Sequence, residues 1–202
     1  MNYLAHLYFA QRNADSHFGN LLGDFGGTKF VEEVPTAVRN GLENHYLVDK
    51  FTDNHSAIKE AKRLFAAQRR RFAGIAIDVV FDHFLIQHWD SFHTEPLAKF
   101  KHHSFALLRE RIPCMPPRMQ HVISHLTTND WFKEYESIAG VGLALDNIAK
   151  RIRFSNNFEG SVEDISRHYQ ELEAIFLAFF PQLSQHVRNH ALERNNKCIK
   201  NK

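Results

Sequence analysis

Apolar side chains recur along this chain every three or four positions, which is the spacing of an amphipathic helix. Leu4, Leu7 and Tyr8 form one such stripe, and residues 55–68 carry another. Residues 74–89, GIAIDVVFDHFLIQHW, are apolar nearly throughout and too long for a single strand. We predict a buried central helix there, with a few polar residues set into it. No pair of strands is recognisable, so the pattern predicts an all-α fold.

Glycine and proline mark where the other helices begin and end. A short helix from near Ser16 is predicted to stop in the glycine-rich run GDFGG, and Pro35 opens a third helix. Further helices are predicted over residues 96–109, 118–128, 142–153 and 162–180, with a kink or restart at Pro181. We expect a single-domain helical bundle over residues 1–195 and a flexible C-terminal tail, residues 196–202.

Composition narrows the class of protein. A hydrophobic fraction of 44% in 202 residues, including 18 Phe, is enough for a core without disulfides or a structural metal. The two cysteines, Cys114 and Cys198, lie far apart, which fits a reducing compartment. The first residues lack a basic region and a long apolar run, and no apolar stretch of about 18 residues follows. We expect a cytoplasmic protein without a membrane or nucleic-acid partner, and its oligomeric state stays open.

Acidic and histidine side chains occur at positions where metal ligands would sit. His45 and Asp49 are four residues apart on the third predicted helix, so both project from one face. Imidazole and carboxylate together suit manganese, iron or zinc. The alternative for such a pair is an ordinary hydrogen bond on the helix surface.

The central helix carries a second pair, Asp78 and Asp82, in almost wholly apolar surroundings. Two carboxylates on one buried face are costly without a partner, so a functional role is favoured. Asp82 alone could instead be satisfied by a core arginine or by the amides of a helix N-terminus. Asp24, within GDFGG, is a third acidic position, beside glycines that permit close approach.

Four segments occur in an order that is more specific than any one of them: MNYLAHLYFA, GNLLGDF, HYLVDKFTDNH and IDVVFDHFLIQHW. Together they resemble the successive motifs of the acyl carrier protein phosphodiesterases, also called acyl carrier protein hydrolyases. The resemblance covers most of the chain and is densest through Trp89. That family is described as a divergent, manganese-dependent branch of the helical HD phosphohydrolases. The usual HD signature has His followed by Asp, whereas this chain has Asp82 followed by His83.

The resemblance implies an HD-domain-like fold and a metal-dependent phosphodiesterase. Its substrate would be holo acyl carrier protein, from which it would remove 4′-phosphopantetheine with Mn²⁺ or another divalent ion. The metal ligands predicted on this basis are Asp24, His45, Asp49, Asp78 and Asp82, with His6 as a further candidate. His83 or His55 is predicted to protonate the leaving serine oxygen, because histidine titrates near neutral pH.

Basic residues gather between positions 59 and 71, although the net charge of the chain is only +2. Given the implied substrate, this segment is predicted to dock the acidic carrier protein through Lys62, Arg63, Arg69, Arg70 and Arg71. The alternative is a merely solvated helix face.

Two other functions remain open. One is an HD-type phosphohydrolase acting on nucleotides. The other is a non-enzymatic helical adaptor whose buried acids only pair with arginines.

Overall fold

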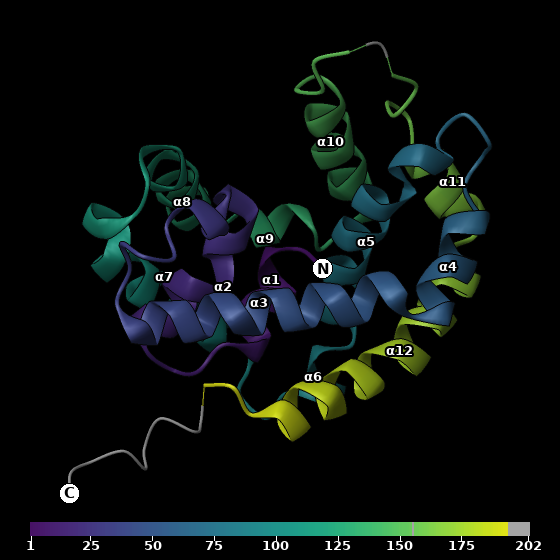
Figure 1. The fold of residues 1–202 in the computed structure, drawn as a ribbon. Helices are drawn as coiled ribbons and strands as arrows, with labels where there is room; N and C mark the ends of the chain where they lie inside the picture. The colour runs from purple at the N-terminus through teal and green to yellow at the C-terminus, as the bar shows by residue number, and fades with distance from the viewer. Residues whose placement is uncertain (155, 194–202) are drawn as a thin grey trace, which may run out of the picture.

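A computed structural model describes residues 1–154 and 156–193, and it confirms the all-α fold over that part of the chain (Figure 1). The α-helices are α1 (Tyr3–Phe9), α2 (Ala14–Leu22), α3 (Thr36–Asn54), α4 (Ser56–Arg63), α5 (Ala73–Gln87), α6 (Trp89–Phe92), α7 (Leu97–Arg111), α8 (Pro117–Asn129), α9 (Trp131–Glu134), α10 (Ile138–Ala149), α11 (Val162–Arg167) and α12 (Tyr169–His190). Short 3-10 turns are η1 (Gly23–Phe25), η2 (Gly27–Lys29), η3 (Arg70–Phe72) and η4 (Ile112–Cys114).

The long helix α3 crosses the molecule, with α12 beside it and the N-terminus near its middle (Figure 1). Two glycines let α2 pack unusually close to α3. A Cβ added to Gly19 would lie 2.1 Å from the carbonyl oxygen of Val38, and one added to Gly41 would lie 2.8 Å from that of Ser16. Larger side chains at these positions would push the two helices apart, so both glycines are needed for this close packing.

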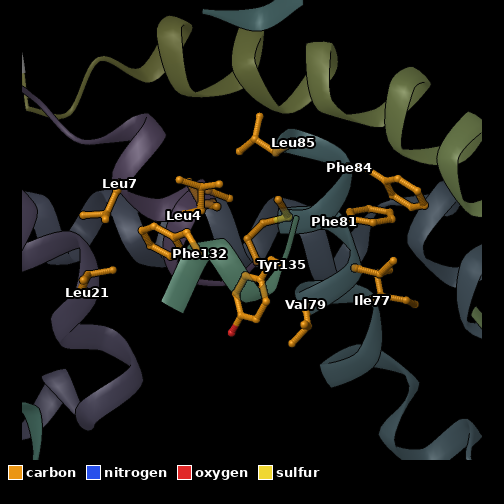
Figure 2. Packing of buried hydrophobic residues seen from close by; sticks show 14 of the residues in the cluster. Leu4, Leu7, Leu21, Ile77, Val79, Phe81, Phe84, Leu85, Phe132 and Tyr135 are labelled. Atoms are coloured by element: carbon orange, nitrogen blue, oxygen red, sulfur yellow. The ribbon is translucent and has the colours of Figure 1, made fainter. Parts of the chain in front are cut away.

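The predicted central helix is confirmed as α5, most of which is buried. Phe81 and Phe84 turn towards α12, where the ring centroid of Phe176 lies 5.3 Å and 5.8 Å from theirs (Figure 2). Leu4 of α1 and Leu21 of α2 belong to the same core. Because α1 contacts both α3 and α5, polar residues from three distant segments meet around α1.

The C-terminal helices differ from the prediction. The predicted helix over residues 162–180 is broken at His168, and α12 then continues through Pro181 to His190 without restarting. The ring of Pro181 is on the exposed side of α12. The carbonyl that loses its helical donor there can be hydrated instead, which explains why the helix tolerates proline.

The helix expected over residues 142–153 also begins and ends earlier, at Ile138 and Ala149. Its start is fixed by Ser137, whose hydroxyl accepts a hydrogen bond from the Gly140 amide at 3.1 Å. The predicted tail, residues 196–202, lies outside the described residues. No helix in the described part of the chain combines the length and apolar character needed to cross a bilayer.

Candidate metal centre

The imidazole of His45 is fixed by its contacts with the preceding helix. Its Nδ1 donates a hydrogen bond to the carbonyl oxygen of Asn20 at 2.8 Å, since a carbonyl can only accept. Nε2 is thereby left to point into the site, which is how metal-binding histidines are usually oriented. The ring also lies directly against η1: a Cβ added to Gly23 would be 2.1 Å from ring atoms of His45. Gly23 is therefore needed for this close approach.

His6 brings a second imidazole to the same place from α1. Its fully buried ring stacks on that of His45, with centroids 4.0 Å apart. Its Nε2 lies 3.3 Å from Oδ1 of Asp49, yet neither nitrogen makes an aligned hydrogen bond within the described structure. Burial and the neighbouring His45 lower the pKa of His6 to about 3, so the ring is neutral near neutral pH. A buried, unpaired imidazole is costly unless its lone pair finds another partner.

Asp49 lies one helical turn after His45 and joins the two imidazoles. Its Oδ2 is 3.0 Å from Nε2 of His45, so the expected i, i+4 contact is present. Burial opposes ionisation of Asp49, but the hydrogen bond from His45 and the nearby Nε2 of His6 outweigh it and hold the pKa of Asp49 well below the usual range. Burial likewise lowers the pKa of His45, but the hydrogen bond and charge of Asp49 more than compensate and raise it.

Two further carboxylates border this cluster. Asp78 of α5 lies 3.0 Å from the α-amino group of Met1, which is also 3.3 Å from Asp49. Burial alone lowers the pKa of this amine, but the charges of Asp78 and Asp49 raise it to about 11. The charge of Asp24 acts on the same amine. Burial raises the pKa of Asp24 to about 6 and also raises that of Asp78. A cation beside these carboxyl groups would favour their charged forms.

His6, His45 and Asp49 form the group best suited to hold a metal ion. One ligand atom from each lies within 4.8 Å of the others. This donor set of two imidazoles and a carboxylate suits Mn²⁺, Fe²⁺ or Zn²⁺, and the unpaired nitrogens of His6 agree with such a role. The side chains of Asp49 and Asp78 remain 35% and 38% exposed, so the cluster is open to solvent on one side.

Asp82 has backbone partners instead. Its two oxygens accept hydrogen bonds from the amides of Leu4 at 2.9 Å and Ala5 at 3.0 Å, and all three residues are fully buried. The carboxylate thus satisfies free amides at the N-terminus of α1, the helix that carries His6. These helix amides, rather than a core arginine, are the partners of the buried carboxyl group, whose pKa is raised to about 7 by burial. The ligand role of Asp82 stays a prediction, and its observed bonds require no ion.

The two histidines predicted as proton donors are not brought to the cluster. His83 is held by the carbonyl of Tyr135, 2.7 Å from Nδ1, and by the hydroxyl of Tyr169, 3.0 Å from Nε2. His55 follows the end of α3, about 9 Å along the helix from the cluster carboxylate. Nδ1 of its ring accepts a hydrogen bond from the amide of Ala57 at 3.2 Å and so caps α4. Both side chains have structural partners, and their catalytic role stays a prediction.

The predicted docking segment contains two kinds of side chain. Arg69 is only 15% exposed and forms ion pairs with Glu163 at 3.1 Å and Asp164 at 3.6 Å. It therefore ties η3 to α11 and has little charge left for a partner. The other predicted docking residues are partly or fully exposed: Lys62, Arg63, Arg70 and Arg71.

Two positioning residues escape sequence reasoning. Asn20 orients His45 through its backbone carbonyl. Every residue has such a carbonyl, so the residue type does not reveal this role. Its side chain is also buried and accepts a hydrogen bond from Asn44 at 2.9 Å. Gly23 belongs to the GDFGG run, but the atom it makes room for lies on another helix. The sequence shows only an asparagine in an apolar helix and a glycine next to Asp24, and neither feature indicates that the residue contacts His45.

The fold and the site together define an all-helical protein with an inward-facing cluster of imidazoles and carboxylates, a class that includes metal-binding helical bundles. A family model described as acyl carrier protein phosphodiesterase matches residues 1–183. The chain belongs to this family, whose members are phosphoric diester hydrolases.

Similar proteins carry the same family name. An acyl carrier protein phosphodiesterase of Enterobacter sp. is 34% identical over 193 residues, covering 95% of this chain and all of the relative. One from Serratia proteamaculans is 34% identical over 195 residues with the same coverage, and one from Yersinia pestis is 34% identical over 190 residues, covering 94% of this chain and 98% of the relative. No solved structure matches the chain significantly, so the HD-type relationship stays a prediction.

Proposed function

We propose that this chain hydrolyses holo acyl carrier protein in a metal-dependent reaction. The bond broken is the phosphodiester between 4′-phosphopantetheine and a serine of the carrier, and apo carrier is the other product. Membership of the family supports the substrate. The observation that supports a metal is the buried imidazole of His6, which stacks on His45 beside Asp49 without a hydrogen bond of its own.

The residues divide this work between holding an ion and shaping its surroundings. His6, His45 and Asp49 would hold the ion, with Asp24 and Asp78 as additional candidates. When bound, a divalent ion, Mn²⁺ by family resemblance, neutralises the diester and lowers the pKa of a coordinated water. The protein keeps the imidazole of His45 in place through Asn20 and stays open to solvent at the carboxylates, where a macromolecular substrate can approach.

Docking of the carrier would use the exposed basic residues near the start of α5. Arg63, Arg70 and Arg71 project from α4 and η3, which precede the helix that carries Asp78. An acidic partner would be attracted mainly over the Debye length of roughly 8–10 Å, so these charges should raise the association rate more than the chemical rate.

Mass spectrometry tests the reaction directly. Holo carrier protein is incubated with the metal-free enzyme, with and without added Mn²⁺. We expect loss of the prosthetic group and appearance of free 4′-phosphopantetheine only when the ion is present. An unchanged carrier mass would refute the substrate assignment, and equal turnover in excess EDTA would refute the metal requirement. Nucleotide mono- and diesters serve as comparison substrates for the alternative hydrolase.

A further inference from the structure

A cavity of about 330 Å³ opens beside the candidate metal centre. Asn2, Tyr3 and Asp24 form the wall nearest the cluster. Asp24 directly follows Gly23, which lies against the His45 ring, and the charge of Asp49 contributes to raising the pKa of Asp24. The opposite wall comes from α9, from α10 and from Arg151, which lies two positions after the end of α10. A group bound at the metal centre could therefore extend into this cavity past Asp24.

The far wall has a mixed character. Trp131, Ala144 and Ile148 supply an apolar surface, while Asn147 and Arg151 supply an amide and a guanidinium group. Ligand sites commonly combine a largely apolar lining with a few polar groups that fix orientation. A ligand that suits this wall has methyl or methylene groups, amide bonds and a negative charge at one end.

The charged side chains that line the cavity are Asp24, Glu134 and Arg151. Burial and the charge of Asp24 raise the pKa of the Tyr3 hydroxyl, and the charges of Arg118 and Arg151 act against that shift. Arg151 is the one cation among the residues that line the cavity. Arginine is well suited to a phosphate because its planar fork donates two parallel hydrogen bonds.

We propose that this cavity binds the pantetheine arm of the substrate, with the phosphate end at Arg151 and the amide-containing chain against Trp131 and Asn147. The inference rests on the proposed function, since it identifies the part of that substrate which the site recognises. Pantetheine carries a pair of geminal methyl groups and two amide bonds, and its 4′-phosphate supplies the negative end. The carrier protein itself would then stay outside, at the exposed basic residues.

The test is binding of free 4′-phosphopantetheine, measured by calorimetry on the full chain. Ala144→Trp should fill the cavity and weaken binding at least tenfold, and Arg151→Ala should weaken it about fivefold. Leu143→Trp and Lys150→Ala are matched controls, because each alters an exposed neighbour outside the cavity lining and should leave the dissociation constant unchanged. Thermal unfolding and Mn²⁺ binding of each variant show whether the fold and the metal centre are intact.

The outcomes separate this inference from the proposed function. If folded Ala144→Trp and Arg151→Ala bind 4′-phosphopantetheine as tightly as the wild type, or if the wild type does not bind it, the cavity is not the arm site. Turnover of holo carrier by the wild type is judged separately, by the mass change of the carrier. If Ala144→Trp fails to fold, Arg151→Ala at the exposed rim decides the matter alone.

Discussion

Replacing Asp82 with alanine should destabilise the protein even when no metal is present. The change removes the acceptors of two buried amides, those of Leu4 and Ala5. Leaving a buried donor unpaired costs about 1–3 kcal/mol, so the two together should cost about 2–6 kcal/mol of unfolding free energy. Water that enters the vacated space would bring the cost towards the lower figure. Reasoning from sequence alone predicts the opposite, a small cost or a slight gain, because removing one of two neighbouring acids relieves repulsion.

Urea unfolding of the EDTA-treated protein, followed by circular dichroism, measures this cost. Asp78→Ala is the comparison variant: Asp78 lies one turn earlier on α5 and is 38% exposed, and its loss removes an ion pair with the Met1 amine but no acceptor of helix amides. We expect a clearly larger loss for Asp82→Ala than for Asp78→Ala, with an intermediate loss for Asp82→Asn, which keeps one acceptor. If Asp82→Ala unfolds with the wild-type free energy, the carboxylate is not what anchors α1.

Three further changes test other parts of the structure. Burial lowers the pKa of His17 to about 4, so the unfolded chain binds a proton that the folded chain does not. The free energy of unfolding should therefore fall, by an amount on the order of 3 kcal/mol, as the pH drops from about 6.5 to about 4. His17→Gln, measured by unfolding at several pH values, should flatten that fall. Gly23→Ala should displace the imidazole beside it and cost about 100-fold in turnover. Gly74→Ala, whose new Cβ would meet its nearest neighbour at 3.5 Å, should be nearly silent. Arg70→Glu should lower kcat/KM for the carrier in low salt and leave kcat unchanged. Lys99→Glu, on another face, should leave kcat/KM unchanged. If the wild type and Arg70→Glu show the same dependence of kcat/KM on salt, docking at η3 is ruled out.

The helical fold was predictable because its signal is local. The stripes of apolar residues predict α3 and α5 closely, because a helix that buries one face has an apolar residue at every third or fourth position. The continuation of α12 past Pro181 was not predictable because sequence does not show which side of a helix faces water. The short helices α6 and α9 are single turns whose position depends on the surrounding core, and four residues carry too little pattern to predict.

The candidate site was predictable only in part, for a related reason. His45 and Asp49 belong to one helix, so their spacing alone places them together. His6 joins them only because α1 packs against α3, and sequence could name it as a candidate without showing its stacking partner. The same limit applies to Asp82, whose partners lie 77 and 78 positions away, and to His55 and His83, whose hydrogen-bond partners are not members of the cluster.

The anchoring of α1 by Asp82 has a kinetic consequence for any ion held at this centre. A helix of seven residues is not stable by itself in water, so α1 keeps its shape only while it is docked. His6 therefore cannot leave the ion by a simple rotation of its buried ring; the helix must undock as a unit. Release of the ion would then be timed by local unfolding, and the amides of Leu4 and Ala5 would exchange with solvent at the rate at which the centre opens.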